Sequence, residues 1–214
     1  MKKISTSRST TSSAIAAAFA IALLCFVVLP SGVTRAEDSP RAVVEKVADA
    51  VLAVLRDTSL TSDEKRSRIE DIVYANVDFA TLSRLVLARN WSRFYETQRE
   101  EFTNEFKRHL SVTYGKNVDS YKNERVAILG DREEARGDWT VQTKILRGGP
   151  EDILVNYRLR RVNTRWAIID FIVEGVSLVS NFRAQFQEII ASGGAEKLLR
   201  LLREKNATGE PLKS

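Results

Sequence analysis

Apolar side chains recur at a helical period between residues 39 and 121. Positions three and four residues apart repeat in four successive stretches, each with polar residues on the opposite face. Each stretch follows residues that can cap a helix, and these starts are Ser39-Pro40, Thr61-Ser62-Asp63-Glu64, Asp78 and Thr97-Gln98-Arg99-Glu100. The pattern therefore predicts four amphipathic helices in succession, which together need a broad apolar surface to cover.

The fourth of these helices has an aromatic stripe. Phe102, Phe106, Leu110 and Tyr114 lie four residues apart, so they share one face of the helix. Such a stripe is typical of a packed core. It becomes the wall of a binding site only where the surface opposite stands away from it.

The pattern changes to strands from about residue 123. Four runs rich in β-branched and aromatic residues cover 125–129, 134–145, 152–161 and 166–173. The links between them are short and turn-like, at Gly130-Asp131, Arg147-Gly148-Gly149-Pro150 and Asn163-Thr164. Links this short join antiparallel neighbours, so the sequence predicts a four-stranded antiparallel meander.

The stretch from Trp166 to Phe186 contains a change of period. Its first eight residues are almost all apolar, which is usual for a strand covered on both faces. After Glu174-Gly175 the apolar spacing becomes helical, with Ser177 or Ser180 as a cap, and Gly193-Gly194 ends this helix before a last short one. We therefore expect an α+β fold in which N-terminal helices pack on the sheet, a C-terminal helix closes it, and an apolar pocket lies between them.

Residues 1–36 have the pattern of a secretory signal peptide. A basic start precedes an apolar run from Ala14 to Leu29 and a cleavage site at Thr34-Arg35-Ala36. This segment holds four of the 33 basic residues, so the rest of the chain has 29 basic and 28 acidic residues and no excess charge for nucleic acid. We expect export to the periplasm, one domain over 37–205, and a flexible polar tail over 206–214.

Few residues suggest chemistry. His109 is the only histidine, and we expect it at the surface or its boundary; a metal site normally needs several ligands together. Ser177 lacks the second glycine of a nucleophile elbow. Asp170, Glu174 and Arg183 are interpreted as structural polar residues, with Arg183 or Arg84 pairing the carboxylates. The alternative is a small enzyme that uses Asp170 as a general base in an apolar pocket.

Three motifs together resemble the MlaC / toluene-tolerance family of exported phospholipid-binding proteins. The first is Trp166, Asp170, Glu174-Gly175-Val176-Ser177-Leu178-Val179, Asn181-Phe182-Arg183 and Phe186. The second runs from Asp78-Phe79 through Arg84-Leu85 and Leu87-Ala88-Arg89 to Trp91, and the third is Asn156-Tyr157-Arg158-Leu159. Phe182 and Ile169 stand where family members often have tyrosine, which leaves open a hopanoid-associated lipid-binding branch.

The resemblance implies a cone-shaped fold like that of nuclear transport factor 2, with acyl chains held between sheet and helices. It implies a monomeric periplasmic phospholipid carrier without a cofactor or catalysis. Its partners would be an inner-membrane ABC-type lipid transporter complex and an outer-membrane lipoprotein–porin complex, and its role would be to maintain outer-membrane lipid asymmetry. A further alternative is an exported adaptor whose apolar groove takes a partner helix.

The inward faces of the predicted elements indicate which residues would bind lipid. The residues that we expect to line the pocket are Val47, Val51, Leu55, Ile72, Leu85, Phe106, Tyr114, Trp139, Val155, Tyr157, Trp166, Ile168, Phe171, Val176 and Val179.

Overall fold

A computed structural model describes residues 38–115, 118, 121, 123–147 and 152–212. All the described residues belong to one compact unit. The expected signal peptide and most of the expected turn at 147–150 lie outside the described residues. Within the described part, no helix combines the length and apolar character needed to cross a bilayer.

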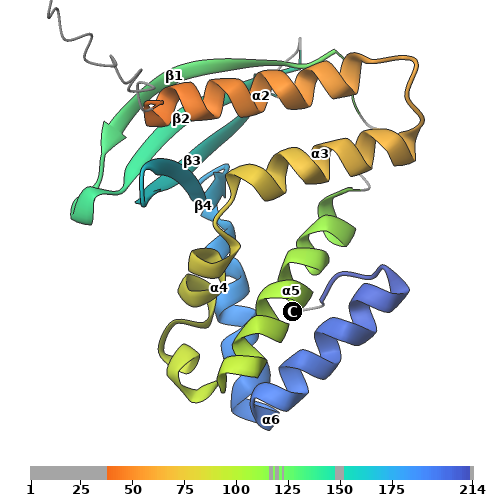
Figure 1. Cartoon of the computed structure of the whole chain (residues 1–214), viewed down its shortest axis with the longest axis vertical. Helices are drawn as coiled ribbons and strands as arrows, with labels where there is room; N and C mark the ends of the chain where they lie inside the picture. The colour runs from red at the N-terminus through yellow and green to blue at the C-terminus, as the bar shows by residue number, and fades with distance from the viewer. Residues whose placement is uncertain (1–37, 116–117, 119–120, 122, 148–151, 213–214) are drawn as a thin grey trace, which may run out of the picture. The chain divides into compact units, whose positions relative to one another are not determined.

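The described elements follow the predicted order of helices, sheet and closing helix (Figure 1). The helices of the first half are α2 (Pro40–Arg56), α3 (Ser62–Asn76), α4 (Phe79–Leu87), the 3₁₀ helix η1 (Ala88–Arg93) and α5 (Glu96–Tyr114). The second half comprises β1 (Arg125–Glu133), the 3₁₀ turn η3 (Ala135–Gly137), β2 (Trp139–Leu146), β3 (Ile153–Val162), β4 (Arg165–Val173), β5 (Val176–Ser177) and α6 (Leu178–Thr208). The α+β class is confirmed.

Three of the four predicted helix starts are confirmed by their caps. The Ser39 hydroxyl accepts a hydrogen bond from the Ala42 N–H at 3.1 Å. Thr61 and Glu64 form the reciprocal capping box, and the Asp78 carboxylate accepts from the Thr81 N–H. These side chains satisfy N–H groups that the first helical turn leaves without backbone partners.

Helix α5 begins earlier than its predicted box at Thr97 to Glu100. Its N-cap position is Tyr95, whose N–H donates to the Gln98 side-chain oxygen at 3.0 Å. Gln98 therefore fills the place that the sequence suggested for Glu100, because a glutamine at the third helical position can reach back as a glutamate does.

The sheet is an antiparallel meander in the order β1-β2-β3-β4-β5. The fifth strand was not predicted, since it is only two residues long and pairs with the end of β4. The predicted turn at Gly130 is wrong: β1 continues to Glu133 and passes a bulge between Ile128 and Gly130. The chain turns instead at Arg136 and Gly137, which have φ values of 67° and 74°, and β2 therefore starts at Trp139.

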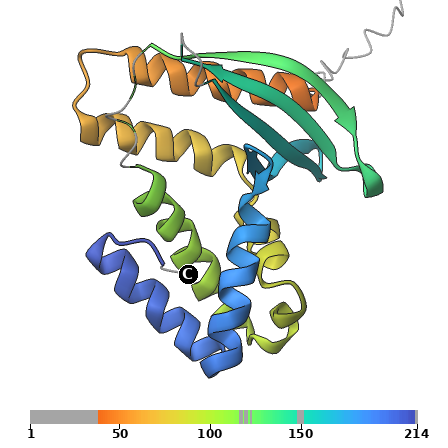
Figure 2. The same ribbon diagram turned by 180° about the vertical axis from the view of Figure 1, so that it is seen from behind.

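Two separate apolar cores hold this unit. One lies between α2 and the sheet, and its buried residues are Val43, Val44, Val77, Val141, Leu159 and Ile168. The other lies among α4, α5 and α6, where Phe102, Phe106, Phe182 and Phe186 contact one another ring to ring. Figures 1 and 2 show α2 along the sheet and α4, α5 and α6 as a group below it. Helix α3 contributes no buried residue to either core.

The C-terminal segment differs from the expected arrangement. Gly193 and Gly194 interrupt the helical backbone as predicted, and Gly194 has a φ of 71°. The second arm of α6 then continues to Thr208, so it includes Asn206, the first residue of the expected tail.

His109 was expected at the surface or its boundary, but the structure buries it with 1% of its surface exposed. Its Nδ1 lies 3.0 Å from the side-chain oxygen of Asn206, which is buried too. This pair joins α5 to the second arm of α6. A polar residue can be buried at little cost when its hydrogen bonds are satisfied in this way.

Candidate functional site

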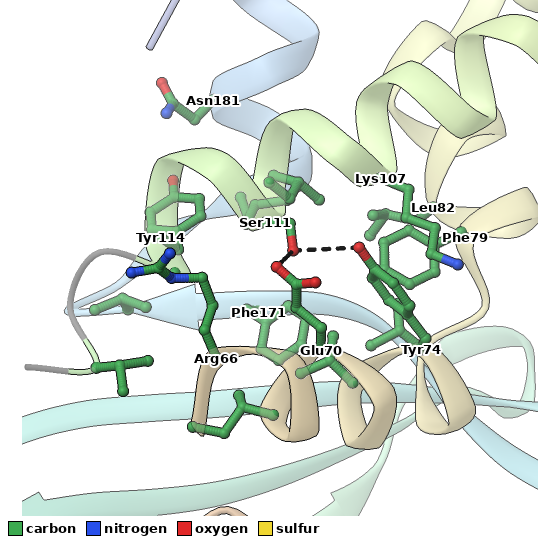
Figure 3. Close-up of a pocket in the computed structure, with 18 of the residues that line it drawn as sticks. Arg66, Glu70, Tyr74, Phe79, Leu82, Lys107, Ser111, Tyr114, Phe171 and Asn181 are labelled. Carbon is green, nitrogen blue, oxygen red and sulfur yellow. Dashed lines mark hydrogen bonds between the residues drawn. The ribbon is translucent and has the colours of Figure 1, made fainter. Parts of the chain in front are cut away.

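An apolar pocket of about 490 Å³ lies between α3, α5 and the corner where β4 passes through β5 into α6 (Figure 3). This volume is within the range of about 300–1,000 Å³ that is usual for small-molecule sites. The described residues that line it are Arg66, Ile69, Glu70, Val73, Tyr74, Val77, Phe79, Leu82, Lys107, Leu110, Ser111, Tyr114, Gly115, Val118, Phe171, Val173, Val176, Leu178 and Asn181.

The pocket exists because α3 stands away from α5 and β4. No residue of α3 is buried, yet Ile69, Val73 and Tyr74 all line the pocket. The helix is fixed at its C-terminal end, where Val77 forms a parallel bridge with Ile168 and the Asp78 N–H donates to the Ile168 carbonyl at 2.9 Å. Most of the apolar face of α3 therefore covers a space; of its wall residues, Val73 alone packs against the core under α2.

Hydrogen bonds cross the pocket wall from α3 to α5. The Tyr74 hydroxyl donates to the Ser111 hydroxyl oxygen at 3.2 Å, and the Ser111 hydroxyl donates to the Glu70 carboxylate (Figure 3). On the same side, the Lys107 ammonium lies 3.5 Å from the centroid of the Tyr74 ring. Ser111 is thus the link through which two polar residues of α3 are connected to α5.

One end of the pocket is open to solvent and the other is closed. Tyr114 and Val176 line it with 48% and 62% of their surface exposed, whereas Leu82 is fully buried. Figure 3 shows Tyr114 and Leu82 at opposite ends of the pocket. Partial burial raises the pKa of the Tyr114 phenol, so this hydroxyl stays protonated at neutral pH. An amphipathic ligand could place its apolar part inward and its polar part at the Tyr114 end.

The β4–β5–α6 corner is held by Asp170. Its carboxylate accepts the Ser177 hydroxyl at 2.6 Å and the Val179 N–H at 3.0 Å, and the Arg158 guanidinium is 4.0 Å away. The predicted pairing of Asp170 with Arg183 or Arg84 is therefore wrong. The basic residue nearest to Asp170 is Arg158, because the meander places Arg158 of β3 directly beside it. Asp170 does not line the pocket, and both its oxygens already accept hydrogen bonds.

Glu174 and Arg183 fasten the two ends of the same corner. The Glu174 carboxylate accepts from the Leu154 N–H, and the Glu174 N–H donates to the Leu154 carbonyl at 2.9 Å. Arg183 donates through two nitrogens to the Leu85 carbonyl, at 3.1 and 2.7 Å. Gly175 between them has a φ of 80°, which glycine adopts without strain.

The structure places three of the fifteen predicted lipid-binding residues on the pocket wall, namely Tyr114, Phe171 and Val176. The residues that belong to or pack against the core under α2 are Val47, Trp139, Tyr157, Trp166 and Ile168. Those in or against the helical core are Leu85, Phe106 and Val179. The remaining residues, Val51, Leu55, Ile72 and Val155, lie outside the wall and are partly or fully buried. For all twelve predicted residues that lie off the pocket wall, contact with a lipid stays a prediction.

Sequence reasoning assigned only Ile72 of α3 to the wall and missed the α3 residues that line it. Ile69, Val73 and Tyr74 are spaced for one helical face, and the spacing of Ile69 and Val73 was visible in the sequence. The polar wall residues Arg66, Glu70 and Ser111 gave no such signal. Among the described residues, no group of histidine, cysteine and acidic side chains is arranged to hold a metal ion.

Comparison with known proteins shows similarity at three levels: a family model, a curated relative and a solved structure. The sequence model of the family described as "MlaC protein" matches residues 45–204. The toluene tolerance protein Ttg2D of Pseudomonas putida is 24% identical over 119 residues, and the match spans 55% of each protein, little more than half of that relative's length. The phospholipid-binding protein from Ralstonia solanacearum, solved in complex with a phospholipid, superposes with a TM-score of 0.73 at 24% identity, covering 80% of this chain and 99% of that one.

Proposed function

Because the chain belongs to the MlaC family, we propose that it is a periplasmic carrier that holds a phospholipid by its acyl chains. The observation that supports this best is the apolar pocket, which closes at Leu82 and opens at Tyr114. The Ralstonia protein of the same fold was solved with a phospholipid.

The energetics of acyl chains explain what such a pocket must do. Each methylene removed from water contributes about 0.8 kcal/mol, so about 30 methylenes in two chains represent roughly 25 kcal/mol. A bilayer already gives the chains the same shelter. Extraction is therefore near balance only when the pocket shields almost all of the apolar surface, and the direction of transport has to come from the partners.

The wider assignment follows the family. Residues 1–36 would direct export to the periplasm. The carrier would then exchange phospholipid between an inner-membrane ABC-type transporter complex and an outer-membrane lipoprotein–porin complex, and so maintain the lipid asymmetry of the outer membrane.

Native mass spectrometry of the protein purified from cells tests lipid binding directly. We expect one or more co-purified phospholipids, and the hopanoid-associated alternative would appear instead as a polycyclic lipid. A protein that carries no lipid from cells and takes none from vesicles would overturn the proposal.

A pair of variants on α3 connects any lipid to this pocket. Ile69→Trp places a large ring on the wall at a position that packs against neither core, whereas Ser67→Trp places the same ring on an exposed position of the same helix. We expect Ile69→Trp to lose most of the bound lipid and Ser67→Trp to retain it, with similar melting temperatures. Equal lipid content in both variants would mean that the lipid binds elsewhere.

A further inference from the structure

Arg66 is a charged residue of the pocket wall that the cross-links between α3 and α5 do not use. Its stem lies against the end of α5: a Cβ added to Gly115 would be 3.3 Å from the Arg66 Cδ and 3.4 Å from its Cγ. Glycine at position 115 therefore leaves room for the arginine side chain. Figure 3 shows the guanidinium beside Tyr114, at the end of the pocket opposite Leu82 and Phe79.

The guanidinium is only partly satisfied by the protein. Its Nη1 donates to the Asp63 carboxylate at 3.1 Å, but Asp63 is 90% exposed, so this ion pair is weak. The Arg66 Nε is buried and has no hydrogen-bond partner among the described residues. A buried N–H without an acceptor is unfavourable, so the Arg66 side chain is not fully satisfied by the protein alone.

The other charges of the wall favour the Arg66 end for an anion. The ammonium of Lys107 is already held over the Tyr74 ring at 3.5 Å. The carboxylate of Glu70, in the middle of the wall, would repel a phosphate placed there. At the Arg66 end the pocket is open to water, with Arg66 itself 37% exposed.

We propose that Arg66 binds the phosphate of a phospholipid whose acyl chains point toward Leu82, and that it gives the pocket its preference for a phosphate-bearing lipid. This inference rests on the proposed function. A guanidinium presents its N–H groups in a planar fork that matches phosphate oxygens, so the contact is geometrically specific as well as charged.

A competition experiment tests the preference. The full protein, stripped of lipid, is offered equimolar phosphatidylglycerol and diacylglycerol with identical acyl chains, and the bound lipids are counted by native mass spectrometry. We expect wild type to bind more phosphatidylglycerol than diacylglycerol. In Arg66→Gln the ratio of bound phosphatidylglycerol to bound diacylglycerol should be about tenfold lower, which is the effect of one charge-assisted hydrogen bond. Arg68→Gln removes the same charge from an exposed position of α3 and should retain it.

The outcomes separate this inference from the proposed function. Wild type that binds neither lipid overturns both. Wild type that binds lipid with a preference unchanged in Arg66→Gln overturns the role of Arg66 alone. Inorganic phosphate, which lacks acyl chains, should not displace bound phosphatidylglycerol. If inorganic phosphate alone bound to the protein and this binding required Arg66, the site would be one for a free anion and the lipid assignment would be wrong.

Asp63→Asn provides a test that does not depend on the folding of an Arg66 variant. This change removes the ion pair with Arg66 and leaves the guanidinium free for the ligand. Because this ion pair is weak, the preference for phosphatidylglycerol should be kept or raised, and a lower preference would contradict the proposal.

Discussion

Ser111→Ala should speed lipid release, because Ser111 links α3 to α5. Its hydroxyl accepts a hydrogen bond from Tyr74 at 3.2 Å and donates one to Glu70. Alanine removes both bonds and leaves the apolar lining of the pocket intact. We expect the release of acyl chains to require that α3 move away from α5, since α3 has no fully buried residue and is fixed to the sheet only near its C-terminal end.

The size of the effect follows from the two bonds. A neutral hydrogen bond contributes about 0.5–1.5 kcal/mol and one to a charged group about 1.5–3 kcal/mol. Ser111 is only partly buried, so water can replace part of both bonds, and about 1–2 kcal/mol is a reasonable net loss. If this loss falls on the barrier to opening, release should become about 5- to 30-fold faster.

The assay is the rate at which preloaded fluorescent phospholipid leaves the protein for an excess of vesicles. Thr103→Ala is the matched control, because its hydroxyl donates to the Arg99 carbonyl within α5 and crosses no gap. An unchanged release rate in a folded Ser111→Ala protein would refute the reasoning, and would indicate that lipid leaves at the Tyr114 end without movement of α3.

Two further predictions concern the polar groups that hold the helices. Burial lowers the pKa of His109, so as pH falls below the ordinary value of about 6.5 the unfolded chain takes up a proton before the folded one does. The free energy of unfolding should therefore be highest above pH 6.5 and should decrease as the pH falls below that value toward the lowered pKa of His109. Urea unfolding at several pH values measures this decrease. A His109→Gln variant that shows the same decrease would contradict the assignment of the effect to His109. Asp170→Asn should lose about 1–3 kcal/mol of stability, because the buried carboxylate accepts from both Ser177 and Val179; intact stability with loss of a lipid-modifying activity would favour the enzyme alternative.

The helix starts were predictable because capping is local. Ser39, Thr61 with Glu64, and Asp78 each bond to a backbone N–H within three residues along the chain. The same locality explains the shifted start of α5, where Gln98 competes with Glu100 for the same role. A turn is harder to predict from one glycine, since Gly130 serves a bulge as readily as a turn.

The pocket wall was harder to predict because periodicity identifies an apolar face but not what lies opposite it. Phe106 and Tyr114 belong to one stripe of α5, yet Phe106 packs among phenylalanines while Tyr114 faces the pocket. The burial of His109 depends on Asn206, which is 97 residues away in the sequence. Contacts of that kind follow from the fold and have no local signature.

Residues of the β4–β5–α6 corner serve both the pocket wall and the two cores. Phe171 and Leu178 line the pocket, but Ile168 and Val179, a few residues away, belong to the two cores. A substitution at the corner therefore changes stability and binding together. Helix α3 is different, because Val73 alone of its wall residues packs against a core and none of them is fully buried. Ligand preference can therefore be altered with the least cost to stability on α3, where Arg66 is found.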